Sequence, residues 1–254
     1  MSLESSIADL VRATTDLTAT VRGKTVEIDG KVAAKISEME VWKNGHLSEH
    51  GFIAVNYNAR MTRVSGEAPQ QVPIAMGLNA GGDFFSKFDL KIIPVVGGVD
   101  PATRPPVVRE LLQYMGCDRH NFTAEFNIVE LTVKSIAKGF GDYVFYIPYR
   151  HIKTGAFHSC VMYHKLVGTA DWGWMDNRFK GAWHQVTQHQ FTPGDAGGYF
   201  HVDVGVTNAS VGDKLYLALP QVVVGKWNPE LRIPPLFNIY DMILNAVPSA
   251  LPSV

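Results

Sequence analysis

Residues 3–42 read LESSIADLVRATTDLTATVRGKTVEIDGKVAAKISEMEVW, and apolar side chains recur along them at alternating steps of four and three residues. This is the a/d heptad pattern of a coiled coil, with leucine at the d positions and Ile or Val at most a positions. Beyond Ile28 the steps become four, four and three residues, a stutter that locally unwinds a supercoil. The apolar residues that we expect to form the oligomerisation seam are Leu3, Ile7, Leu10, Leu17, Val21, Ile28, Val32, Ile36 and Met39.

Three features of this segment weaken an isolated helix. Gly23 and Gly30 each cost about 1 kcal/mol in a helix interior. The polar residues Thr14 and Lys24 fall at seam positions, and five threonines are poor helix formers. We therefore expect a helix that is stabilised by partner chains, with an amphipathic helix lying on its own body as the alternative. The seam leaves the number of strands open, although this choice of a and d residues favours two strands in simple peptides.

The composition changes sharply after this segment. Residues 1–45 hold 13 charged residues, no proline and one aromatic residue, whereas residues 46–254 hold all 14 prolines and 26 of the 27 aromatic residues. This split predicts a helical stalk at 1–45 and a mostly β body at 46–254. Within the body, a C-terminal subdomain at about 150–230 is expected.

Alternation with period two, bounded by Gly, Pro, Asn and Asp clusters, predicts eight strands in the body. They are Phe52–Thr62, Phe84–Val96, Phe122–Ser135, Asp142–Pro148, Ala156–Leu166, Trp183–Phe191, Tyr199–Val206 and Lys214–Val224. One short helix is expected to begin at Pro105-Pro106 and to end at Gly116. The expected fold class is therefore mainly β: an N-terminal helical coiled-coil stalk, then a β-sandwich or jelly-roll body with one short helix.

The charge balance and the cysteine count exclude several classes of protein. The 254-residue chain has 23 Lys and Arg against 24 Asp and Glu, so neither nucleic acid nor an anionic membrane would find a basic field. Two cysteines are too few for a disulfide scaffold or a zinc finger. No apolar run approaches the ~18 residues of a membrane span, so no membrane insertion is expected. The N-terminus lacks the regions of a signal peptide, which favours synthesis in a reducing cytosol.

No arrangement of residues indicates catalysis. The acidic residues of the body are scattered through turns rather than paired, and no nucleophile elbow, phosphate-binding loop or dinucleotide-binding motif is present. Six of the nine histidines lie between His151 and His201, but none has the spacing of a metal ligand pair. We therefore expect no catalytic residue, no metal and no cofactor, and we expect Cys117 and Cys160 to act as small apolar side chains.

One segment has the composition of a sugar-binding loop. Sugar rings stack on exposed aromatic faces while their hydroxyls bind amides, carboxylates and guanidinium groups. The residues that offer this mixture are Trp172, Trp174, Asp176, Asn177 and Arg178. The alternative is that one tryptophan closes the end of the sandwich and the other lies at a contact between subunits. A further polar face, formed by His184, Gln188 and Gln190, either binds a glycan or is solvated.

Two segments resemble parts of phage proteins. Residues 5–42, with a Thr/Ala-rich heptad helix, a GK…ID step and then VAAKI, resemble the N-terminal part of tailed-bacteriophage fibre proteins. Such fibres are characteristically homotrimers, so the resemblance implies three strands. The segment GDKLYLALPQVVVGKWNP (212–229), which follows GGYFHVDVGV (197–206), resembles the closing strands of carbohydrate-binding-module-like jelly rolls in phage structural proteins.

These resemblances imply a homotrimeric virion fibre or appendage protein that is made in the host cytoplasm. The stalk would bind other virion proteins, and the body would contact host-surface polysaccharide. The alternative is a purely structural neck or collar fibre or head-decoration protein, and a third hypothesis is a glycan-degrading tail enzyme. The apolar tail after Pro234-Pro235 is expected to pack either on its own domain or on a neighbouring subunit.

Overall fold

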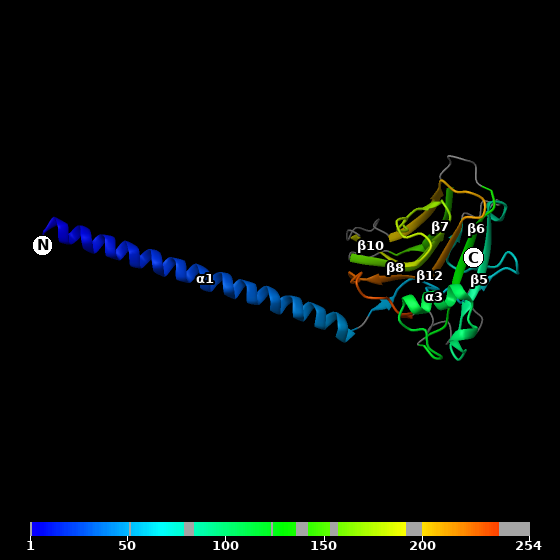
Figure 1. The fold of residues 1–254 in the computed structure, drawn as a ribbon, viewed down its shortest axis with the longest axis horizontal. Coiled ribbons are helices and arrows are strands. Elements are labelled where there is room, and N and C mark those ends of the chain that lie inside the picture. Colours follow the sequence, from blue (N-terminus) through cyan, green and yellow to red (C-terminus); the bar gives the residue numbers. More distant parts are fainter. Residues whose placement is uncertain are drawn as a thin grey trace. The chain divides into compact units, whose positions relative to one another are not determined.

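The computed structural model describes residues 2–50, 52–78, 84–122, 124–135, 142–152, 157–191 and 200–238. In this part of the chain the protein is mainly β-strand, with a long N-terminal helix and few further helical turns (Figure 1). The predicted class, mainly β behind an N-terminal helix, is confirmed. The chain divides into two compact units, Met1–Gly51 and Phe52–Val254.

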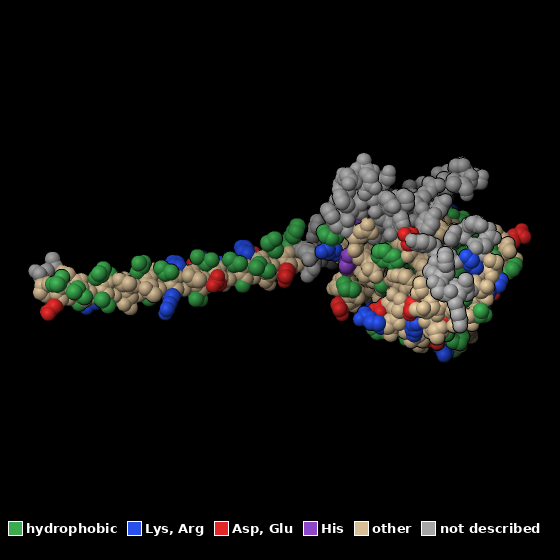
Figure 2. All heavy atoms as spheres, turned by 90° about the horizontal axis from the view of Figure 1, so that it is seen from above, with side chains coloured by type: hydrophobic (Ala, Val, Ile, Leu, Met, Phe, Trp, Pro, Cys, Tyr) green, Lys and Arg blue, Asp and Glu red, His purple; other side chains and the backbone are tan. Residues whose placement is uncertain are grey.

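The first unit is a single helix, α1 (Leu3–His50), of 48 residues. It passes through Gly23 and Gly30 without a break and continues beyond the predicted stalk end at residue 45. At 1.5 Å per residue its length is about 72 Å. All nine predicted seam side chains are between 51% and 77% exposed in the single chain, and Figure 2 shows apolar side chains along the length of the helix.

The five threonines of α1 hydrogen-bond to the helix itself. Each hydroxyl donates to the carbonyl four residues earlier, as Thr14 does to Leu10 at 2.8 Å and Thr25 does to Val21 at 3.0 Å; the other donors are Thr15, Thr18 and Thr20. A hydroxyl bonded in this way needs no water, and its methyl group is left to pack against a neighbour. The polar seam position Thr14 is therefore compatible with burial.

The second unit is built on a seven-stranded sheet. Its main path runs β10 (Trp183–Phe191), β8 (Phe157–Val167), β12 (Lys214–Val224), β1 (Ile53–Ala54) and β13 (Phe237–Asn238). β6 (Phe126–Val133) pairs with both β12 and β5 (Phe88–Val95). All these pairings are antiparallel except that of β1 with β13, which is parallel. β10 and β12 have the bounds that the sequence predicts.

Smaller elements complete the unit. A four-stranded sheet has the order β4 (Gly77–Leu78), β7 (Asp142–Ile152), β11 (Phe200–Thr207) and β9 (Asp171–Trp172). β2 (Val64–Ser65) and β3 (Val72–Pro73) form a hairpin. The helical elements are α2 (Phe84–Lys87), the 3₁₀ turn η1 (Pro101–Thr103) and α3 (Pro106–Tyr114). The last of these is the predicted short helix.

Apolar side chains pack on both faces of the large sheet. Cys160, Met162 and Leu166 of β8 belong to a core shared with Val202, Val204 and Val206 of the smaller sheet. The intervening residues Val161 and Tyr163 belong to a second core with Leu111 and Leu112 of α3. Since successive strand residues point to opposite faces, β8 is buried on both sides, and the sheet forms the middle layer between α3 and the second sheet.

Some predicted strands are wrong in extent. The strand predicted at 52–62 is reduced to Ile53–Ala54, because asparagine side chains take over the backbone bonds that a longer strand would need. Asn56 accepts from the Val222 N–H at 2.8 Å, and Asn58, at φ 55°, accepts from Arg63 N–H at 3.0 Å. The strand predicted at 84–96 begins with the turn α2 instead, while β7 extends beyond Pro148 to Ile152. Most of the apolar C-terminal tail lies outside the described residues.

A buried arginine fixes the connection that leads into α3. Arg104 is 7% exposed, and its guanidinium lies 2.6 Å from the Asp118 carboxylate. The same group donates to the carbonyls of Arg119 at 2.8 Å and Val99 at 3.2 Å, so that one side chain joins both ends of the helical segment. Its face also lies 5.4 Å from the centre of the Phe122 ring.

We predict that Arg104→Ala lowers the free energy of unfolding by about 3 kcal/mol, because it leaves a carboxylate and two carbonyls without their buried partner. Arg109→Ala, an exposed arginine on α3, is the matched control and should change it by less than about 0.5 kcal/mol. Urea unfolding of both variants measures the difference. Equal losses in the two variants would contradict the assigned role of Arg104.

Candidate functional site

The predicted sugar-binding loop lies between β9 and β10, and its first tryptophan is part of the core. Trp172 is 0% exposed, pairs through its backbone with Val206 of β11, and its ring centre lies 6.3 Å from that of Phe88. The sequence placed Trp172 on a binding surface, and the structure corrects this. Because the whole indole side chain of Trp172 is buried, neither face of its ring is available to a sugar.

The chain then turns so that the second tryptophan points outward. Gly173 donates to the Gly205 carbonyl at 2.8 Å, and a Cβ at this position would lie 3.2 Å from the Gly205 nitrogen. Glycine therefore permits the close approach of the loop to β11. Trp174 follows with a left-handed φ of 65° and a side chain that is 40% exposed. Of the two predicted stacking residues, Trp174 is the one that a ligand could reach.

Asn177 holds the turn together. Its Oδ1 accepts from the Trp172 N–H at 2.8 Å, and its Nδ2 donates to the carbonyls of Trp172 at 2.9 Å and Met175 at 3.3 Å. These three bonds occupy both donors and one lone pair of the amide. Asn177 was predicted to bind a sugar hydroxyl, but its side chain is committed to the loop backbone.

Asp176 and Arg178 form a two-point ion pair at the surface. Arg178 Nε lies 2.8 Å from Asp176 Oδ1, and the second guanidinium nitrogen lies 2.7 Å from Oδ2. This contact lowers the pKa of Asp176 to about 2. The exposed guanidinium keeps free donors, so the pair presents both a carboxylate and a cation on the loop that carries Trp174.

A second aromatic surface lies beside this pair. Phe179 stacks on His184 with the ring centres 4.0 Å apart and the planes 9° apart. Arg178 lies 5.7 Å from the centre of the Phe179 ring, and His184 Nε2 lies 3.7 Å from Asp176. Phe179 is 44% exposed. The contacts therefore join Asp176, Arg178, Phe179 and His184, and Trp174 is exposed on the same loop. The sequence did not indicate Phe179.

Behind His184 lies a buried histidine that the sequence also did not indicate. His164 pairs with His184 across β8 and β10, and their ring centres are 5.7 Å apart. His164 is fully buried, and neither ring nitrogen has a hydrogen-bond partner. Burial, followed by the neighbouring His184, lowers the pKa of His164 to about 4. The cross-strand partner of His164 depends on strand register, which the sequence alone does not show.

A contact between serine and histidine elsewhere resembles half of a hydrolase site. Ser159 Oγ lies 2.8 Å from His189 Nδ1, but it also donates to the Gly225 carbonyl at 2.7 Å and accepts from the Trp227 N–H at 2.8 Å. The hydroxyl proton is therefore directed to a carbonyl rather than to the histidine. This geometry ties β8 to the end of β12 and does not activate a nucleophile.

Among the residues that the structure describes, no three His, Cys, Asp or Glu side chains are grouped so that they could hold a metal ion. None of the helices in the described ranges combines the length and the apolar character that crossing a membrane requires. Cys160 is buried, Cys117 is partly exposed, and both are free thiols.

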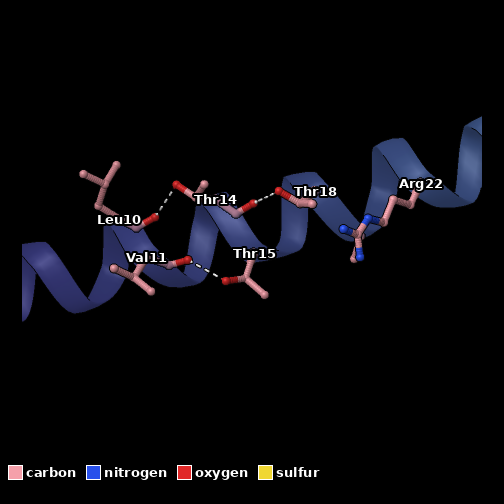
Figure 3. A pocket seen from close by; sticks show the side chains of 7 residues that line it. Leu10, Val11, Thr14, Thr15, Thr18 and Arg22 are labelled. Carbon is pink, nitrogen blue, oxygen red and sulfur yellow. Dashed lines mark hydrogen bonds between the residues drawn. The ribbon is translucent and has the colours of Figure 1, made fainter.

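The first unit offers a different kind of surface. A shallow groove follows α1 between two rows of side chains spaced four residues apart (Figure 3). One row contains Leu10, Thr14, Thr18 and Arg22, and the other contains Val11, Thr15 and Ala19. Rows of this spacing are the ridges between which a second helix packs. The small side chains of Thr and Ala leave room for that approach.

Comparison with protein families, with curated proteins and with solved structures gave no match for this chain.

The buried histidine predicts a loss of stability in acid. Between pH 6.5 and about 4 the unfolded chain binds a proton at His164 that the folded chain does not, so stability falls as the pH is lowered. His164→Leu should remove about 2–3 kcal/mol of this loss between pH 7 and pH 4.5.

Urea unfolding across that range measures the effect. The exposed His120 provides the control, and His120→Gln should follow the wild-type curve. A His164→Leu protein that loses as much stability in acid as the wild type would contradict the prediction.

Proposed function

We propose that this protein is a homotrimeric fibre or appendage protein of a tailed-phage virion, made in the host cytoplasm. In this proposal, α1 of three chains forms a coiled-coil stalk that binds other virion proteins, and the β-rich unit forms a jelly-roll-like body. The observation that carries the proposal is the row of nine apolar seam residues, all more than half exposed along one 48-residue helix.

An exposed row of nine apolar side chains is not expected on a helix that has no packing partner. Isolated helices owe little of their stability to propensity and depend on packing of an apolar face. Contiguous exposed apolar surface of this kind marks an interaction site. Because the row follows a heptad, the partner that fits it best is another helix with the same repeat, which a second copy of this chain supplies.

The polar seam positions fit such a bundle. Thr14 satisfies its hydroxyl within the helix. Lys24 turns its ammonium to Glu27 at 2.7 Å, and Lys31 binds the other oxygen of the same carboxylate at 2.7 Å. The stem of Lys24 can then cover apolar neighbours while its charge stays at the rim. The choice of three chains over two rests on the resemblance to phage fibres.

The body supports two versions of this function. In the first, Trp174, Asp176, Arg178 and Phe179 contact host-surface glycan, since both rings are partly exposed on the loop that carries the carboxylate and the guanidinium. In the second, the protein is a structural neck, collar or head-decoration component without a receptor role. The burial of Trp172 and the commitment of Asn177 to the backbone favour the second version.

The stalk is tested by two double substitutions, at pairs of residues that are similarly exposed in the single chain. Leu10 and Leu17, on the seam, are 67% and 63% exposed, while Val26 and Val41, off the seam, are 72% and 69% exposed. Leu10→Ser with Leu17→Ser should reduce the mass measured by light scattering from three chains to one, because it removes apolar contacts at six seam positions of the trimer.

Val26→Ser with Val41→Ser should leave the trimer intact. A wild-type mass of one chain, or equal effects of the two double substitutions, would contradict the stalk proposal. A wild-type mass of two chains would change the number of helices in the coiled coil from three to two.

The glycan version is tested with Trp174→Ala and a panel of bacterial surface polysaccharides. We expect binding of the trimer to fall at least about tenfold, because one aromatic stacking contact is lost. Trp42→Ala, which removes an exposed tryptophan of α1, is the control and should bind as the wild type does. Unchanged binding in Trp174→Ala would remove the site, and a wild type that binds no polysaccharide would favour the structural version.

A further inference from the structure

Three apolar side chains lie exposed in a row at one end of the large sheet. Ile53 of β1, Val224 of β12 and Phe237 of β13 are 46%, 47% and 55% exposed, and we call them the sheet-end patch. Ile53 is paired with Phe237, and the pairing of Ala54 with Val223 places Ile53 opposite Val224. Directly paired residues of neighbouring strands project from the same face, so the three side chains form one surface.

This surface continues the face of the large sheet that packs against the smaller sheet. Val55 follows Ile53 by two residues and packs against the core, and Val222 precedes Val224 by two residues and is fully buried in it. Residues two apart in a strand share a face. The sheet-end patch is therefore a half-exposed part, in a single chain, of the face that packs against the smaller sheet, and it contains no charged side chain.

We infer that the sheet-end patch is a contact surface for the same patch of other copies of this chain, an inference that rests on the proposed trimer. The short connection between α1 and β1 is the reason to expect another copy of this chain at the patch. Ile53 follows the last residue of α1, His50, by three residues, so it lies within about 10 Å of the helix end. Helices in a bundle are 8–10 Å apart. Any oligomer held by α1 therefore brings the copies of Ile53 close together.

The size of the patch decides what the contact does. Three half-exposed side chains fall well short of the roughly 800 Å² per partner that a stable interface buries. The patch therefore does not hold chains together unaided. When α1 tethers the bodies, their effective concentration reaches the millimolar range, where a small apolar contact is sufficient to keep them side by side. Its loss should separate the bodies without changing the number of chains.

The test uses the full-length chain with Val224→Lys and Phe237→Lys, which places several positive charges where the copies meet. Light scattering should still give the mass of three chains, while small-angle X-ray scattering should give a larger radius of gyration than that of the wild type. Val211→Lys is the control. Val211 is exposed and precedes Lys214, the first residue of β12. It therefore lies beyond the end of β12 opposite Val224, and the strand between them is about 33 Å long. This substitution should leave the radius unchanged.

A second measurement introduces no charge. In a Cys117→Ser background, Val224→Cys should be linked between chains by a short bis-maleimide several-fold more than Val167→Cys, which lies at the far end of β8. An unchanged radius in the lysine variant together with equal linking at the two cysteines would overturn the inference, as would a patch covered within its own chain. A wild-type mass of one chain would instead overturn the proposed function, and the inference with it.

Discussion

The apolar row on α1 is the constraint on which the proposed function depends. From Leu3 to Met39 it extends for about 54 Å, and every one of its side chains is more than half exposed in the single chain. A helix that contains two glycines gains little from propensity, so in the proposed trimer its stability would come from burial of that row. The threonines do not oppose this, because each hydroxyl is bonded within the helix.

In contrast to the exposed apolar row of α1, the central strands of the body are buried on both faces. β8 and β12 contribute side chains to the core between the sheets and to the core under α3. Polar groups in these strands must then find partners inside the protein. Ser159 does so through three contacts, whereas His164 does not and stays neutral at ordinary pH.

The loop after β9 shows how structural demands limit a binding surface. Trp172 and Asn177 lie within five residues of Trp174, yet one fills the core and the other closes the turn. What remains at the surface is an ion pair on a loop that also carries two partly exposed rings, Trp174 and Phe179. An arginine already paired with a carboxylate has fewer donors to offer, so a ligand would have to bind the pair as a unit.

Local patterns in the sequence determined the long helix, the short helix α3 and the bounds of β10 and β12, because periodicity and Pro or Gly boundaries act over a few residues. The same patterns identified Trp174, Asp176 and Arg178 as neighbours on one loop. They could not separate Trp172 from Trp174, since the two differ in burial and not in composition. The tertiary structure alone decided that difference, the shortening of the strand at 52–62 by asparagine contacts, and the cross-strand meetings of His164 with His184 and of Ile53 with Val224 and Phe237. The cross-strand contacts depend on strand register, which is set by contacts between residues far apart in the chain.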